Sequence, residues 1–214
     1  GKVYWIPPVS ICHLYPITPV SIGGICVPRN LLTQFGVDGE SYTRNALTSL
    51  LVASEVAKVF HLPIYTMQGS STWDSPQVYW SNQIAHIDNT IASQLIHMVE
   101  PITMGVRGFS EDLSNPNVYL NTLAGFEMVI NLDNGGSWGR ISMQCAAAGA
   151  PAIVSDSLFS KFLYPYTHCS PYDLKRATQI AYRLLRDPKF KQHVVQTARR
   201  RLIRLCSPES VTQR

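Results

Sequence analysis

The sequence lacks any long apolar run, and no stretch approaches the ~18 residues that a membrane-spanning helix needs. Charge is also scarce: only 15% of the 214 residues are charged, whereas 45% are hydrophobic and 10% are aromatic. This composition excludes extended disorder and supplies enough apolar material for one globular core. The first residues, Gly1–Trp5, show no basic segment followed by an apolar one, so no secretory signal is expected there.

Cysteine is sparse as well. The five cysteines are odd in number, widely scattered and never in a Cys-x-x-Cys pair. This pattern predicts a reduced, cytoplasmic protein. The six histidines form no two-ligand cluster with cysteine or carboxylates, so we predict no metal site and no resident cofactor.

Strand and helix patterns alternate along the chain. After a proline-rich extended lead-in over 1–20, apolar runs predict buried strands at Val20–Val27, Pro63–Met67, Thr103–Val106, Glu127–Leu132 and Pro151–Ser155. Helical spacing predicts helices at Tyr42–Phe60, Ser81–Met98, Val118–Ala124, Trp138–Ala148, Tyr172–Arg186 and Pro188–Leu205. The alternation predicts an α/β fold: a three-layer, Rossmann-like domain over 21–208 with a mostly parallel six-stranded sheet, followed by a tail at 209–214.

Ligands of such sheets lie outside the carboxyl ends of the strands. We therefore expect the loops 28–34, 107–112, 133–139 and 155–160 to converge on one site. In Asn131–Arg140 a strand leads through a glycine-rich turn into a helix, with Ser137 as the expected N-cap and Gly149 as the expected stop. Glycines let backbone N–H groups approach a ligand, and a helix amino end favours an anion by about 0.3–1 kcal/mol. A tight turn without a ligand is the alternative interpretation.

This stretch, together with Gln144–Val154, resembles the carboxyl-terminal, donor-binding half of GT-B glycosyltransferases. In the large retaining group the corresponding segment carries a Glu-x7-Glu pattern before Gly-x-Pro-Val-Ile. Aligned from Gly149 and Pro151, the two glutamates fall on Gly136 and Gln144. The resemblance implies that the first position contacts the donor sugar and the second the nucleotide ribose. Both acidic members are absent here, so the motif is degenerate.

The resemblance extends to the segment Pro171–Leu174, to Leu184–Pro188 and to Val27–Asn30, which is similar to the loop that supplies a cation to the donor diphosphate. It implies a donor site formed by Arg29, Arg107, Gly135, Gly136, Ser137, Gly139, Arg140 and Gln144. No catalytic residue is assigned.

The resemblance implies a glycosyltransferase that transfers a sugar from a nucleoside diphosphate sugar. Arg29 and the 135–139 backbone would neutralise the leaving diphosphate without a metal. Two domains of this kind need about twice this length, so the acceptor-binding amino-terminal half is expected to be missing from these residues.

Two alternatives stay open. One is a non-catalytic Rossmann-like binding module with a degenerate donor site. The other is binding through the arginine cluster of Arg199, Arg200, Arg201 and Arg204, either to a membrane surface or to nucleic acid. Nucleic acid is the less favoured partner because the cluster lacks interleaved aromatics. His168 and Cys169 are adjacent in sequence, which does not by itself make a nucleophile pair.

Overall fold

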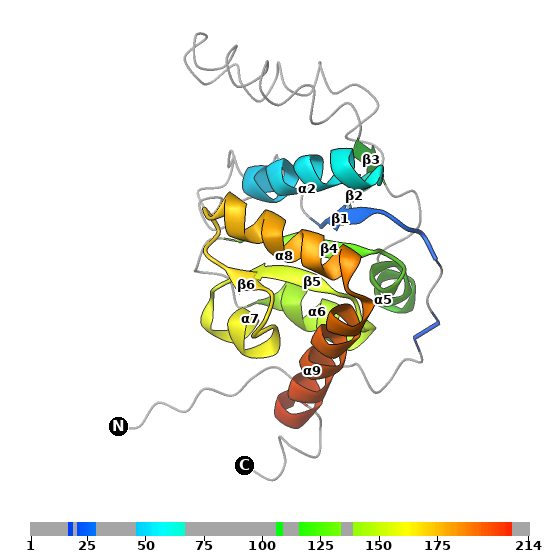
Figure 1. The fold of residues 1–214 in the computed structure, drawn as a ribbon. Coiled ribbons are helices and arrows are strands. Elements are labelled where there is room, and N and C mark those ends of the chain that lie inside the picture. The colour runs from blue at the N-terminus through cyan, green and yellow to red at the C-terminus, as the bar shows by residue number, and fades with distance from the viewer. Residues whose placement is uncertain are drawn as a thin grey trace, which may run out of the picture.

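Figure 1 shows the computed structural model of the chain, which describes residues 17–18, 21–28, 46–66, 106–108, 116–133 and 139–206. The elements of the first half are β1 (Ile25–Val27), α2 (Ala46–Phe60), β2 (Ile64–Thr66), β3 (Val106–Gly108) and α5 (Pro116–Ala124). Those of the second half are β4 (Met128–Asn131), α6 (Arg140–Ala148), β5 (Ala152–Ser155), α7 (Leu158–Leu163), β6 (His168–Cys169), α8 (Leu174–Arg186) and α9 (Pro188–Cys206).

The strands form one sheet in the order β3-β2-β1-β4-β5-β6, and each neighbouring pair is parallel. The chain runs outward from β1 to β3, returns to the centre, and then runs outward again from β4. The order therefore reverses between β1 and β4, where Ile25 pairs with Met128 and Cys26 with Val129. The predicted α/β class with a parallel sheet is confirmed.

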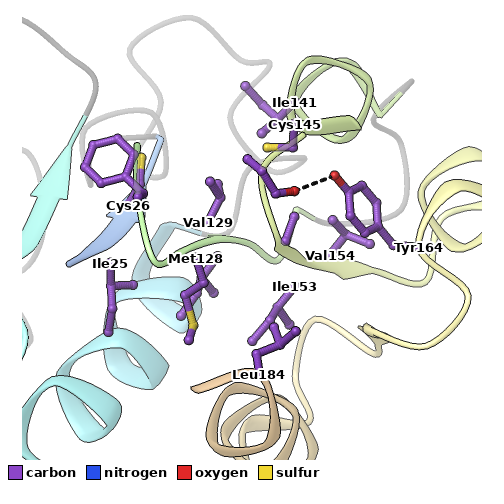
Figure 2. Packing of buried hydrophobic residues seen from close by; sticks show 14 of the residues in the cluster. Ile25, Cys26, Met128, Val129, Ile141, Cys145, Ile153, Val154, Tyr164 and Leu184 are labelled. Atoms are coloured by element: carbon purple, nitrogen blue, oxygen red, sulfur yellow. Dashed lines mark hydrogen bonds between the residues drawn. The ribbon is translucent and has the colours of Figure 1, made fainter. Parts of the chain in front are cut away.

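Helices cover both faces of this sheet. On one face α2 packs against β1, β2 and β4, and its neighbour α8 packs against β5 and β6. On the other face α6 packs against β4 and β5 and also contacts α5, α7 and α9. Figure 2 shows this division within β5, where Ile153 points toward Leu184 of α8 and Val154 points toward Tyr164. Because both faces are covered, β4 and β5 are buried along their whole length.

Aspartates start the last two helices. The Asp173 carboxylate accepts the backbone N–H of Arg176 at 2.9 Å, and the Asp187 carboxylate accepts that of Phe190 at 2.9 Å. Both bonds satisfy donors that an α-helix leaves unpaired at its amino end. The boundaries of α8 and α9 are therefore close to those predicted from the sequence.

Other boundaries differ from the prediction. β1 occupies only the end of the predicted Val20–Val27 run, and β3 lies just after most of the predicted Thr103–Val106 strand. The predicted helix Ser81–Met98 lies outside the described residues. Two short elements, α7 and β6, were not predicted, and α7 occupies part of the expected loop 155–160. Six residues are too few for helical periodicity to be visible in a sequence.

Candidate functional site

The candidate site lies where the sheet order reverses, at the carboxyl ends of β1 and β4. Directly after β4 the backbone N–H of Leu132 donates to Ser49 Oγ at 3.0 Å, in a buried contact. Ser49 lies near the amino end of α2, so this bond holds the start of α2 against the chain that leaves β4. The next residue, Asp133, is buried as well. Ser49 was missed by the sequence analysis, where it was one polar residue inside a predicted helix.

The amino end of α6 follows this segment and begins differently from the prediction. The helix starts at Arg140 with Gly139 as its cap residue, whereas Trp138 and Ser137 were the predicted start and cap. Gly139 has a left-handed backbone, with φ 72° and ψ 27°. A glycine adopts this conformation at little cost, and because the conformation is not that of a right-handed helix, α6 begins only at the next residue.

A glycine cap has no side chain to offer to the helix. The first bond within α6 runs from the Met143 N–H to the Gly139 carbonyl at 2.9 Å. The N–H groups of Arg140, Ile141 and Ser142 precede it and receive no side-chain hydrogen bond from the cap residue. Such an end, with backbone donors and the positive pole of the helix, suits an anion.

The amino end of α6 is supported by α7. Ser142 Oγ lies 2.7 Å from Ser160 Oγ, and both side chains are buried. A Cβ atom added to Gly139 would lie 3.0 Å from Ser160 Oγ and 3.2 Å from Phe159 Cδ1. The contact between α6 and α7 therefore leaves little room at residue 139, and Ser160 and Phe159 would have to move slightly to admit a side chain. The unpredicted α7 is thus part of the framework of the site.

Gln144 lies one turn further along α6. Its Oε1 accepts a hydrogen bond from the Tyr119 hydroxyl of α5 at 3.1 Å. The carbonyl oxygen is thus engaged by the protein, while the side-chain NH2 carries two further donors. Tyr119 is 25 residues away in sequence, and the sequence analysis did not identify it as a partner.

The remaining predicted site residues fall in three groups. Arg140 is the exposed first residue of α6, so it lies at the site. Arg107 lies within β3, where its backbone pairs with Tyr65 of β2, rather than in the loop where it was predicted. Two strands, β2 and β1, separate β3 from β4, so the structure does not bring Arg107 next to α6. Arg29, Gly135, Gly136 and Ser137 lie outside the described residues.

The buried thiols lie within the fold. Cys26, Cys145 and Cys169 are free cysteines, and all three are buried. Burial raises the pKa of Cys169 to about 12 and the pKa values of Cys26 and Cys145 well above their ordinary range. A thiol kept neutral in this way is a poor nucleophile. His168 and Cys169 are also successive residues of a strand, whose side chains point to opposite faces.

Within the described residues, no three side chains of His, Cys, Asp or Glu are gathered as metal ligands. In the same part of the chain, no helix combines the length and the apolar character needed to cross a membrane.

The fold is that of one half of the GT-B glycosyltransferases. A sucrose-phosphate synthase from Thermosynechococcus elongatus superposes with a TM-score of 0.64 at 16% identity, covering 100% of this chain and 51% of that one. A UDP-forming α,α-trehalose-phosphate synthase from Burkholderia xenovorans gives a TM-score of 0.61 at 10% identity over 90% of this chain and 43% of that one. TarM from S. aureus, solved in complex with UDP, gives 0.57 at 12% identity over 100% of this chain and 36% of that one.

The chain therefore spans about half the length, or less, of these structural neighbours. No family model and no curated protein matches the sequence. Since all three identities are low, the likeness shows the fold and leaves the substrate open.

Proposed function

We propose that the chain is the donor-binding half of a glycosyltransferase and that it binds the nucleoside diphosphate of a sugar donor. The observation that carries this proposal is the amino end of α6. It has no side-chain cap, and it lies at the carboxyl edge of a parallel sheet beside the reversal between β1 and β4. Open α/β sheets bind their ligands at this position. The glycosyltransferase fold of the neighbours supports the same ligand class.

The proposed chemical role of this end is to stabilise the leaving group. During transfer, the bond between the anomeric carbon of the sugar and a diphosphate oxygen breaks, and negative charge grows on the diphosphate. Backbone N–H groups of α6 that are already oriented stabilise this charge without reorganising. The exposed guanidinium of Arg140 adds a positive charge at the same end. Arg29 and the backbone of 135–137 are further proposed contacts, carried by the resemblance alone.

Gln144 is proposed to contact the ribose as a donor. A glutamate at this position would accept hydrogen bonds from the ribose hydroxyls. Because the Tyr119 hydroxyl already donates to Oε1 of Gln144, the amide NH2 is the group left to face a ligand. The direction of the hydrogen bond would therefore be reversed relative to the Glu-x7-Glu pattern. We propose that a second domain, which would account for the additional length of the neighbours, binds the acceptor.

Calorimetric titration of the chain with UDP, GDP, ADP and their sugar conjugates tests this function. We expect one nucleotide series to bind saturably. Because hydrogen bonds to charged groups contribute about 1.5–3 kcal/mol, Arg140→Ala should weaken that binding roughly tenfold or more. Lys175→Ala is the matched control, since Lys175 is an exposed cation on α8. The nucleotide affinity of this variant should equal that of the parent chain. A folded sample that binds no nucleotide, or binds one equally well after Arg140→Ala, would contradict the proposal.

Two variants test the ribose contact. One is Gln144→Glu alone, and the other combines Gln144→Glu with Tyr119→Phe. If the amide NH2 is the contacting group, Gln144→Glu should weaken binding of the ribonucleotide, because its carboxylate removes both donors. Removing the Tyr119 hydroxyl as well leaves both carboxylate oxygens to accept from the ribose, and binding should recover. Equal affinities for the three chains would show that residue 144 does not contact the nucleotide.

A further inference from the structure

Positive charge is concentrated on the last three helices. Eleven of the eighteen Lys and Arg residues of the chain lie on α7, α8 and α9, and these helices contain no carboxylate. Among the described residues, the carboxylates beside these helices are Asp156, the helix caps Asp173 and Asp187, and Glu127, which pairs with Lys191 at 2.6 Å. Within the described part of the chain, the cations of these helices outnumber the neighbouring carboxylates, so this region carries net positive charge.

Exposed apolar side chains occur on the same helices. On α7, Leu158 is 81% exposed and Phe162 is 37% exposed, and the exposed cation Lys161 lies between them in sequence. The spacing of residues 158, 161 and 162 places all three on one face of the helix. The outer face of α7 is therefore both apolar and basic.

Two contacts join this face to the flank of α9. Arg201 donates through Nη1 to the backbone carbonyl of Phe162, and its guanidinium lies 5.2 Å from the centre of the Phe162 ring. The His193 ring lies 5.0 Å from that of Tyr166, in the segment after α7. The α9 flank that carries residues 193 and 201 thus borders α7, as the packing of the two helices in Figure 1 also shows.

Helical periodicity places two further arginines on this flank. Arg200 is seven residues after His193, and Arg204 is four residues after Arg200, so all three follow one side of α9. Both arginines are exposed. We call the resulting set the α7–α9 surface, and it consists of Leu158, Lys161, Phe162, Arg200 and Arg204. In the arginine cluster identified in the sequence, Arg201 contacts Phe162, and the side chains of Arg200 and Arg204 are exposed.

We propose that the α7–α9 surface docks on an anionic membrane. Its arginines and lysine attract acidic headgroups, each contributing about a fivefold gain in affinity. Leu158 and Phe162 are placed to insert among the headgroups and acyl chains, as apolar side chains of interfacial helices do. A nucleic acid would bind through the cations of this surface alone and would not bury the exposed side chain of Leu158. The apolar side chains therefore favour a lipid surface, and a docked enzyme would meet a membrane-bound acceptor.

Cosedimentation with vesicles tests this proposal on the 214-residue chain. The probes are vesicles of phosphatidylcholine alone and vesicles that also contain about 30 mol% of the anionic lipid phosphatidylglycerol. We expect binding to the anionic vesicles only. Arg200→Gln with Arg204→Gln should weaken it about 30-fold at low salt, and Leu158→Ser about tenfold. The matched control, Lys58→Gln with Lys175→Gln, removes two exposed cations of α2 and α8 and should change binding less than about twofold.

The alternatives give different results. Equal binding to both vesicle types, or binding that the arginine pair and Leu158→Ser leave unchanged, would overturn the proposal. So would binding to an RNA oligonucleotide without binding to vesicles, or self-association that Leu158→Ser abolishes without vesicle binding. The melting temperature of each variant is measured as well, and a variant that melts at the temperature of the parent chain has kept its fold.

Discussion

Each end of α6 carries a glycine in the left-handed conformation, but the two ends differ in how their backbone groups are hydrogen-bonded. Gly149 at the carboxyl end has φ 73° and ψ 27°, and Gly139 at the amino end has φ 72° and ψ 27°. At the carboxyl end, N–H groups of the chain satisfy the helix carbonyls: Gly149 donates to the Ala146 carbonyl at 3.4 Å and Ala150 to that of Cys145 at 2.9 Å. At the amino end, Gly139 supplies no side-chain bond. One end is thus closed by its own chain, whereas the other is suited to a ligand.

The largest expected effect is that of Gly139→Ala. Alanine at positive φ costs about 1–2 kcal/mol, and the new Cβ would press on Ser160 Oγ and Phe159. We expect a total loss of about 2–4 kcal/mol of unfolding free energy, together with weaker nucleotide binding.

Gly149→Ala is the matched control for Gly139→Ala. Its φ strain is the same, but the new Cβ would meet only Val195 Cγ1, at 3.8 Å. Denaturant unfolding should show a smaller loss, about 1–2 kcal/mol, with nucleotide affinity unchanged. Equal losses for the two variants would show that the contact with α7 does not distinguish the two ends.

The second prediction concerns Tyr164, which hydrogen-bonds to the chain at the carboxyl end of α6. The hydroxyl of the buried residue Tyr164 donates to the Ala150 carbonyl at 3.0 Å, just after Gly149 (Figure 2). Burial also raises the pKa of Tyr164 well above its usual range, so the hydroxyl stays a donor. Tyr164→Phe should cost about 1–3 kcal/mol in thermal or denaturant unfolding, because a buried carbonyl loses its donor. A change in nucleotide affinity of the folded variant would contradict the assignment of this bond to stability alone.

A smaller loss of stability is expected when the hydroxyl contact between Ser142 of α6 and Ser160 of α7 is removed. Ser142→Ala should destabilise the chain by about 1 kcal/mol, because it leaves Ser160 Oγ without this partner. The double variant Ser142→Ala with Ser160→Ala should be no worse than the single one, since both polar groups are then gone. A double-mutant cycle measures this coupling, and additive losses would show that the two hydroxyls act independently.

The smallest effect concerns pH and lies away from α6. Burial is the main cause that lowers the pKa of His168, partly offset by Asp156, with Lys161 and Arg176 adding to the lowering. The unfolded chain then binds the proton more readily, so stability falls as pH drops below about 6.5, the ordinary pKa of histidine. Melting temperatures of the parent chain and His168→Gln, compared at pH 7.5 and 5.5, should show a smaller acid-induced drop in the variant. An identical drop in both chains would contradict this assignment.

The carboxyl end of α6 could be predicted from the sequence, and the amino end could not. Gly149 directly follows an apolar helical run, which is a local pattern with a local cause. Gly139 lies close to Phe159 and Ser160 of α7, and this helix is too short to show periodicity in the sequence. In the same way, the contacts of Ser49 with Leu132 and of Tyr119 with Gln144 join residues 83 and 25 positions apart. The β4 strand, the body of α6 and the parallel sheet were predicted correctly, because the buried positions of strands and helices appear in the sequence as periodic apolar residues.

Hydrogen exchange at the backbone amides of α6 tests the central claim most directly. The chain would be compared with and without a saturating nucleoside diphosphate, residue by residue. The account predicts slower exchange at Arg140, Ile141 and Ser142, because these N–H groups would donate to the diphosphate, and unchanged exchange at Gly149 and Ala150. Binding without added protection at the amino end of α6 would contradict it.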